Sequence, residues 1–237
     1  PKKTSGSTEV KFTFDATSLR GKTIVVFEEL YQDDLKLAVH TDIEDEDQTI
    51  YFPEIKTTAK DAHTDSNLSL ADKEVTLVDT VTYKNLLPGK EYVMTGTLMD
   101  KETGETVVID DKKVTAETTF TPETAEGTVD VQFTFDGSTL AGKTVVVFES
   151  VSYEGKEFAV HADLKDEGQT IYFPEIKTTA KDNVSGNHYA KPEKEITLID
   201  TVSYQNLIPG KEYTLTGTLM DKETKKPLEA DGKPITA

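Results

Sequence analysis

The sequence contains no cysteine among its 237 residues. Disulfide bonds therefore cannot stabilise the fold, and no thiolate is available as a nucleophile or as a metal ligand. Any covalent reinforcement of this protein must use other side chains.

Basic residues are also scarce. The chain has 26 Lys and Arg residues against 44 Asp and Glu residues, which gives a formal net charge of −18 at pH 7. Such a surface repels the phosphates of nucleic acids and of anionic lipids. No apolar run approaches the roughly 20 residues that a membrane-spanning helix needs. We therefore expect neither a nucleic-acid partner nor a membrane partner.

A sustained helical periodicity is missing as well, and alternation of apolar and polar residues takes its place. Residues 10–14, 23–30, 74–83 and 91–99 alternate in this way and are rich in Val and Thr. Turn signals such as the LLPGKE segment of residues 86–91 separate them. The length suits about two domains of ordinary size. The sequence predicts an all-β protein of tandem Ig-like β-sandwich domains.

The chain repeats itself with an offset of 121 residues. The segment TIYFPEIKTTAKD begins at Thr49 and again at Thr170, and DTVTYKNLLPGKEY at Asp79 is answered by DTVSYQNLIPGKEY at Asp200. One structural module is therefore about 121 residues long.

The phase of the repeat predicts three segments. Residues 54–174 form one complete domain, residues 1–53 the back half of a second, and residues 175–237 the front half of a third. We expect the front half of one molecule to complete the back half of the next, head to tail. The end of one module, QTIYFP, runs directly into the start of the next, PEIKTTA. This absence of a linker predicts stiff junctions.

Several polar residues share a strand face with apolar ones. Alternation places Thr57 with Ile55 and Ala59, and it places Asp79 between Leu77 and Val81. The same reasoning predicts inward-facing side chains for two residues of the other strands, Glu149 and Gln169, and for the counterparts in the partial modules, Thr178, Asp200, Glu28 and Gln48.

Burying an unpaired amide or hydroxyl group costs about 1–3 kcal/mol, and an unpaired carboxylate costs more. We therefore expect the polar groups of a module to lie together and to bond one another. His161 and His40 each precede the glutamine of their module by eight residues. Taken singly, each residue also fits an ordinary role, such as β-propensity or a turn cap.

At these residues the chain resembles a known family, the ester-bond-forming domains of Gram-positive surface adhesins, also described as VaFE repeats. The family's histidine-to-glutamine signature is similar to HTDIEDEDQT and HADLKDEGQT, and its threonine strand is similar to PEIKTTAKD. Its aspartate strand is similar to DTVTYKNLLPGKEY, and the strand that gives the repeats their name is similar to VVFE. The resemblance covers the whole chain.

The resemblance implies that the Thr57 hydroxyl attacks the Gln169 carboxamide, which releases ammonia and leaves an intramolecular ester. His161 is then the candidate base, Glu149 orients and stabilises it, and Asp79 donates a hydrogen bond to the amide oxygen. The reaction happens once in each module, so we expect no turnover enzyme. It requires no cofactor and no metal.

In the partial modules the same set is divided between molecules, with Thr178 and Asp200 on one side and Glu28, His40 and Gln48 on the other. The resemblance then implies an intermolecular ester from Thr178 to Gln48, so that the chain is its own partner. It further implies a structural stalk module of an extracellular adhesin on the bacterial cell surface, anchored to the cell wall in the parent protein, with an unknown host ligand.

Three alternatives stay open. The chain could be an adhesive module that binds a host ligand without any cross-link, or a hydrolase that uses Thr, His and Asp. The acidic runs 42–47 and 163–168 could hold calcium, although their spacing lacks the glycine and terminal glutamate of an EF-hand loop. A solvated loop is the simpler interpretation of both runs.

Overall fold

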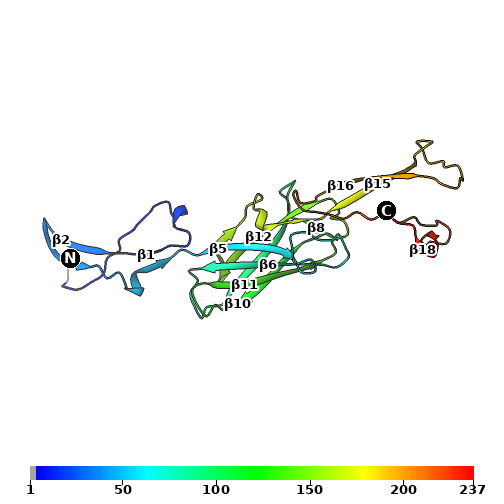
Figure 1. Cartoon of the computed structure of the whole chain (residues 1–237). Helices are drawn as coiled ribbons and strands as arrows, with labels where there is room; N and C mark the ends of the chain where they lie inside the picture. Colours follow the sequence, from blue (N-terminus) through cyan, green and yellow to red (C-terminus); the bar gives the residue numbers. More distant parts are fainter. Residues whose placement is uncertain (1–3) are drawn as a thin grey trace. The chain divides into compact units, whose positions relative to one another are not determined.

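The computed structural model describes residues 4–237 and consists almost entirely of β-strands (Figure 1). Pro1, which the repeat aligns with Pro122, lies outside the described residues together with Lys2 and Lys3. The chain divides into two compact units, one ending at Asn206 and one spanning Leu207–Ala237. Within the described part, no helix has the length and apolar character that crossing a bilayer would require.

Two antiparallel sheets form the central module. Strands β11 (Gly127–Phe135), β6 (Val75–Lys84) and β5 (Glu54–Asp61) make the first sheet in that order. The order in the second sheet is β10 (Thr115–Phe120), β7 (Tyr92–Asp100), β12 (Thr144–Tyr153) and β13 (Lys156–His161), and β14 (Thr170–Tyr172) also pairs with β12. Figure 1 shows these strands, coloured cyan to yellow, packed side by side. The predicted all-β sandwich fold is confirmed.

Alternation along the strands decides which side chains enter the core. In β5 every second residue from Ile55 to Asp61 is buried, and in β6 the same holds from Val75 to Tyr83. The residues between them are exposed or half-buried. Thr57 and Asp79 therefore face inward, as the sequence predicted. Each is in phase with the buried residues of its strand, which are mostly apolar.

The core of the sandwich is filled by aliphatic and aromatic side chains of both sheets. Phe133 of β11 is 1% exposed and lies against Gly96 of β7 in the opposite sheet. A Cβ atom at position 96 would lie 2.5 Å from Phe133 Cζ. Gly96 therefore lets the two sheets approach closely enough for the ring to fill the space between them.

The segments on either side repeat parts of the central sandwich. The first flank contains β1 (Thr23–Val25) paired with β4 (Thr49–Tyr51), and β2 (Glu28–Gln32) paired with β3 (Leu35–His40). The short 3₁₀ helix η1 (Thr17–Leu19) precedes β1, and η2 (Glu46–Gln48) lies between β3 and β4.

The β2–β3 hairpin copies β12–β13, including the register shift, which follows Leu30 in one hairpin and Val151 in the other.

The second flank begins with the hairpin of β15 (Glu175–Asp182) and β16 (Leu198–Gln205), whose register copies that of β5 and β6. The unit that starts at Leu207 contains the short strands β17 (Glu229–Ala230) and β18 (Lys233–Pro234). In the central module, β8 (Val108–Ile109) and β9 (Lys112–Lys113) form the corresponding hairpin.

Both flanks expose apolar side chains whose counterparts in the central module are buried. Phe12 is 60% exposed, whereas Phe133, which occupies the same position in the repeat, is 1% exposed. Leu198 is 43% exposed, whereas its counterpart Leu77 is fully buried. Each flank thus exposes side chains of a sandwich core that it does not complete by itself.

The segment boundaries 1–53, 54–174 and 175–237 remain a prediction. The strands of the complete sandwich run from Glu54 to Tyr172 and fall within the expected central segment. The compact units, in contrast, divide after Asn206, because the β15–β16 hairpin is in contact with the central module at Phe173 and Gly142.

The pair Phe133 and Phe12 gives a matched test of this fold. We expect Phe133→Ala to lower the free energy of unfolding of the central module by about 3–5 kcal/mol, because it removes a fully buried ring and leaves a cavity. Phe12→Ala should leave that transition almost unchanged in dilute monomeric protein. Urea denaturation measures both. Equal effects of the two substitutions would contradict the assignment of the core.

Candidate functional site

Four polar side chains meet inside the sandwich. Thr57 of β5 and Asp79 of β6 come from the three-stranded sheet, and Glu149 of β12 comes from the five-stranded sheet. Gln169 ends the 3₁₀ helix η3 (Glu167–Gln169), directly before β14. Their exposed fractions are 9% for Thr57, 1% for Asp79, 1% for Glu149 and zero for Gln169. The site therefore bridges the two sheets.

A short turn directs Gln169 into the core. Asp166 precedes η3 and accepts a hydrogen bond from the Gly168 amide through its side chain, at 2.8 Å. Its carbonyl oxygen accepts a second bond from Thr170 Oγ1 at 2.7 Å. Lys101 Nζ donates to the same hydroxyl oxygen at 2.9 Å. These bonds fix the chain on both sides of Gln169.

One carboxylate oxygen connects the two residues of the expected ester. Glu149 Oε2 accepts a hydrogen bond from Gln169 Nε2 at 2.6 Å and another from Thr57 Oγ1 at 3.2 Å. Thr57 belongs to the edge strand of one sheet, and Gln169 belongs to the turn beside the other. Glu149 therefore holds a hydroxyl group and a carboxamide group against each other across the core.

The two carboxyl groups of the site share this buried space. Burial, followed by the neighbouring Asp79 carboxyl, raises the pKa of Glu149 to about 11. Burial likewise raises the pKa of Asp79. Two adjacent carboxyl groups without water cannot both ionise at low cost. The pair therefore retains a proton at neutral pH.

Buried acceptor atoms without a hydrogen-bond donor mark the same place. Both Asp79 carboxyl oxygens, Glu149 Oε1 and Gln169 Oε1 are fully buried and have no hydrogen-bond partner. A proton held between Asp79 and Glu149 would satisfy one oxygen of each. Gln169 Oε1 is left as an unsatisfied carbonyl oxygen beside an acidic pair, and such an oxygen is a natural place for negative charge to develop.

His161 lies beside this cluster, on the edge strand β13. It is the cross-strand partner of Glu149, so both side chains are on the same face of the sheet. Its Nε2 atom is 2.8 Å from Asp166 Oδ2. The expectation that Glu149 holds His161 is wrong for this structure, because Glu149 Oε2 is bonded to Thr57 and Gln169 and Asp166 occupies the position beside the imidazole.

The sequence analysis missed Asp166. A signal was present, since His161 and Asp166 are five residues apart and His40 and Asp45 repeat this spacing. Asp166 also caps η3, so the same side chain fixes the imidazole and the turn that carries Gln169.

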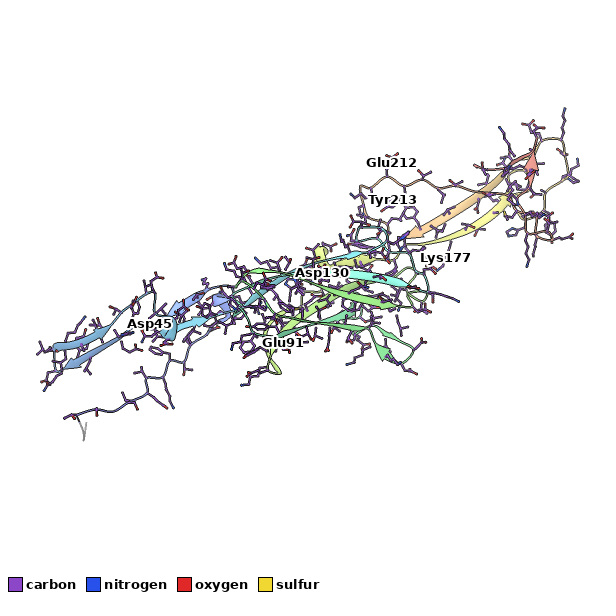
Figure 2. The ribbon with its side chains drawn as sticks, turned by 90° about the horizontal axis from the view of Figure 1, so that it is seen from below. Asp45, Glu91, Asp130, Lys177, Glu212 and Tyr213 are labelled. Atoms are coloured by element: carbon purple, nitrogen blue, oxygen red, sulfur yellow. The ribbon has the colours of Figure 1, made fainter. Side chains whose placement is uncertain are left out.

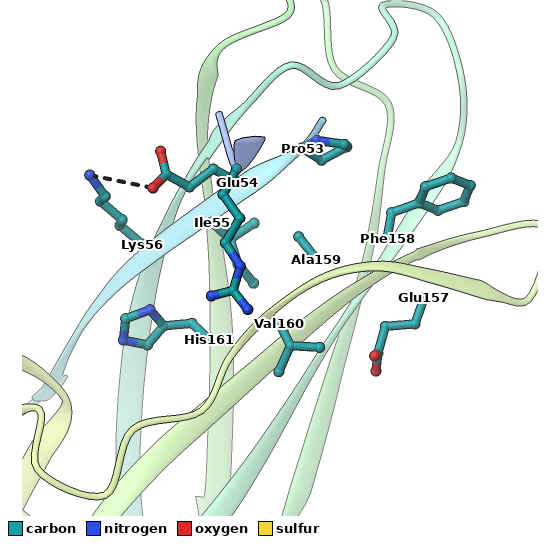
Figure 3. Close-up of a pocket in the computed structure, with 10 residues that line it drawn as sticks. Pro53, Glu54, Ile55, Lys56, Glu157, Phe158, Ala159, Val160 and His161 are labelled. Carbon is teal, nitrogen blue, oxygen red and sulfur yellow. Dashed lines mark ion pairs between the residues drawn. The ribbon is translucent and has the colours of Figure 1, made fainter. Parts of the chain in front are cut away.

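A cavity of about 400 Å³ opens at the seam where β5 and β13 face each other without pairing. Figure 3 shows Lys56 and Ile55 of β5 on one side of it and His161 and Val160 of β13 on the other. The imidazole therefore borders a space open to solvent, whereas Gln169 does not.

The flanks hold divided copies of the site. In the first flank, Gln48 Nε2 donates to Glu28 Oε2 at 2.8 Å, and His40 Nε2 is 2.7 Å from Asp45, which Figure 2 labels. These contacts copy the pairs Gln169–Glu149 and His161–Asp166.

In the second flank, Thr178 and Asp200 occupy positions on β15 and β16 that copy those of Thr57 and Asp79. Both residues are exposed. Among the hydrogen bonds of residues 4–237, none joins Thr178 to Gln48.

The residues that the structure describes contain no group of three or more His, Asp or Glu side chains arranged to hold a metal ion. The acidic runs 42–47 and 163–168 form capped turns instead, in which Asp45 and Asp166 accept hydrogen bonds from backbone amides.

Comparison with protein families matches the chain to the T-Q ester bond containing domain over residues 1–52, 53–173 and 174–237. These limits lie one residue before those expected from the repeat. No curated protein sequence matches the chain significantly.

Among solved structures, the chain is similar to a bacterial adhesin from Mobiluncus mulieris containing intramolecular disulfide, isopeptide and ester bond cross-links. In one crystal form the identity is 17% and the TM-score 0.44, with 73% of this chain and 90% of that chain covered. In another the identity is 15% and the TM-score 0.40, with 65% and 74% covered.

A glycosyl hydrolase family 2 member from Bacteroides cellulosilyticus matches at 12% identity and a TM-score of 0.39, over 55% of this chain and 16% of that one.

The raised pKa of Glu149 makes stability depend on pH. Its ordinary value is 4.5, so between about pH 4.5 and 11 the folded state holds a proton that the unfolded chain has lost. The free energy of unfolding must fall as the pH rises through this window, by at most about 1.4 kcal/mol per pH unit. We expect this slope in Thr57→Ala, which cannot form the ester, when urea denaturation is followed at several pH values.

The matched control is Thr57→Ala combined with Glu149→Gln, which keeps the shape of the side chain but cannot ionise. Its stability should fall less steeply over the same pH range, because Glu149 no longer contributes and only Asp79, whose pKa burial also raises, still does. Identical pH profiles of the two proteins would show that Glu149 does not hold the proton.

Proposed function

Because the chain belongs to the T-Q ester bond containing domain family, we propose that residues 53–173 form a module that cross-links itself through an ester between Thr57 Oγ1 and the side-chain carbonyl carbon of Gln169. The observation that carries this proposal is the shared contact of Thr57 and Gln169 with Glu149 Oε2. That contact holds the nucleophile next to the carboxamide before any reaction.

The reaction needs no other reactant. Thr57 Oγ1 attacks the Gln169 Cδ atom, the Cδ–Nε2 bond breaks, and the nitrogen leaves as ammonia with the proton that the hydroxyl has lost. The central module has one such glutamine, Gln169, and the reaction consumes its carboxamide. The module therefore reacts once and is not a turnover enzyme.

The surrounding groups divide the proton chemistry between them. The Thr57 hydroxyl donates to Glu149, and His161 is the cross-strand partner of Glu149, so the imidazole base lies on the same face of the sheet as the group that holds the nucleophile. Asp166 orients that base. The proton of the Asp79–Glu149 pair stabilises the charge that develops on Gln169 Oε1 during the attack.

The position of the bond suits a structural module under tension. Thr57 lies in the first strand of the sandwich and Gln169 directly before the last, so the ester closes a loop of about 112 residues. The chain-entropy model developed for disulfides assigns such a loop roughly 4–5 kcal/mol. Tension that enters at β5 and leaves at β14 then passes through the covalent link and not through the core.

These features support a stalk module of an extracellular adhesin on a bacterial surface. The protein has no cysteine, so a disulfide cannot provide the reinforcement that such a stalk needs. An ester formed from Thr and Gln is independent of the redox state of the surroundings.

The flanks suit a head-to-tail assembly of this chain with a second copy of itself. The first flank presents Glu28, His40 and Gln48, and the second presents Thr178 and Asp200, so together they contain the whole set of residues. Their exposed apolar faces also belong together in one core, since Phe12 matches Phe133 and Leu198 matches Leu77, and Phe133 and Leu77 are cross-strand partners in the central module. Joining the two faces would build a second site between molecules.

Intact mass under denaturing conditions tests the internal ester. We expect the folded wild-type protein to be lighter than its sequence by one ammonia molecule, because Gln169 loses its nitrogen when the ester forms. Thr57→Ala should retain the full sequence mass. Thr58→Ala, at an exposed neighbouring position of the same strand, is the control and should still lose ammonia. An unmodified mass in correctly folded wild-type protein would exclude the cross-link.

Concentrated protein tests the head-to-tail assembly. We expect multimers by light scattering, and a ladder of covalent multimers on denaturing gels if the Thr178–Gln48 ester also forms. Gln48→Ala should remove the ladder and leave the internal ester intact, because residues 53–173 are unchanged. Monomeric protein at high concentration would refute assembly without affecting the internal ester.

A further inference from the structure

The first flank meets the central module at an arrangement of backbone hydrogen bonds just before Pro53. The Gly21 amide donates to the Phe52 carbonyl oxygen at 3.0 Å, and the Phe52 amide donates to the Lys22 carbonyl oxygen at 3.0 Å. These bonds extend the β1–β4 ladder to the last residue of the flank. The carbonyl oxygens of Lys22 and Phe52 therefore have fixed positions, and each retains a free lone pair.

Asn85 uses both of these lone pairs. It lies in the turn that follows β6, and its Nδ2 atom donates to Lys22 O at 3.0 Å and to Phe52 O at 3.3 Å. Its backbone has a φ of +60°, in the left-handed region, which asparagine tolerates better than most residues. A residue of the central module thus binds the final strand pair of the segment before it.

The second junction repeats part of this arrangement. Asn206 has a φ of +58°, and its Nδ2 atom donates to Phe173 O at 3.5 Å. The Gly142 amide donates to the same oxygen at 2.9 Å, as Gly21 does to Phe52 O. At two junctions, 121 residues apart, an asparagine side-chain amide therefore donates to the equivalent carbonyl oxygen, that of Phe52 or Phe173.

The glycine at each junction gives the next module room to approach. Gly21 has a φ of +70°, and a Cβ atom there would lie 2.6 Å from Glu54 Oε2. At Gly142, with a φ of +79°, a Cβ atom would lie 1.9 Å from Gln205 Nε2. A side chain at either position would displace the Glu54 or Gln205 side chain of the next module and would strain the left-handed backbone.

We propose that this arrangement is a clamp between modules, in which the asparagine after the second strand of each module binds the last strand pair of the module that precedes it. Only Pro53 separates Phe52 from the first strand of the central module, so the backbone at this point has few free torsions. Bonds from Asn85 to two carbonyl oxygens restrict bending and rotation about those torsions. The partner surface is therefore the Lys22–Phe52 end of the preceding module.

The clamp is independent of the ester. Asn85, Lys22 and Phe52 make no hydrogen bond to Thr57, Glu149 or Gln169. The ester fixes strands within one module, whereas the clamp fixes one module against the next. A stalk of cross-linked modules would still bend at its joints without such a device.

A distance measurement between two spin labels tests the clamp directly. Because the chain lacks cysteine, Thr23→Cys and Thr128→Cys introduce the only labelling sites, both exposed and on strands of the two segments that the clamp joins. The labelled protein is diluted with unlabelled protein to suppress signals between molecules. We expect one narrow distance distribution, and we expect Asn85→Ala to broaden it and remove its single maximum.

Asn206→Ala is the matched control, since it removes the equivalent bond at the other junction and should leave this distribution unchanged. Intact mass should show loss of one ammonia in all variants, which separates a failure of the clamp from a failure of the ester. A distribution of equal width in Asn85→Ala and in the parent protein would overturn the proposal, and so would a broad distribution in the parent protein.

Discussion

The structure depends on one constraint: polar groups buried in an apolar core must satisfy one another. Glu149 is the main acceptor in this cluster, because its Oε2 atom accepts hydrogen bonds from both Thr57 and Gln169. The remaining acceptors of Asp79 and Gln169 have no donor except a proton retained by the carboxyl pair. A cluster of this kind is costly as a structural feature alone. As the starting state of an acyl transfer, its reactive groups are in place and isolated from water.

The sandwich explains why this chemistry produces mechanical reinforcement. Thr57 lies on the edge strand of one sheet, and Gln169 lies beside the other sheet across an unpaired seam. A bond at that place joins the two layers and the first and last strands at once. The Asn85 contact adds a restraint of a different kind, between modules, so that the ester and the clamp together limit both unfolding and bending.

The sequence predicted what depends on strand alternation. Thr57, Asp79 and Glu149 face inward because their strands alternate regularly, and burial confirms those orientations. The contact between His161 and Asp166 could not be obtained in this way, since both faces near His161 are apolar and the bond depends on the η3 turn. The role of Asn85 was equally inaccessible, because it requires a left-handed backbone and carbonyl oxygens more than 30 residues away in the sequence.

Peptide mapping tests the central claim most directly, because it locates the bond. Cleavage after glutamate residues separates residues 55–74, which contain Thr57, from residues 168–175, which contain Gln169. The account predicts one species in which these two peptides are joined, with a mass equal to their sum less one ammonia molecule. Recovery of the two peptides as separate and unmodified species from correctly folded protein would contradict it.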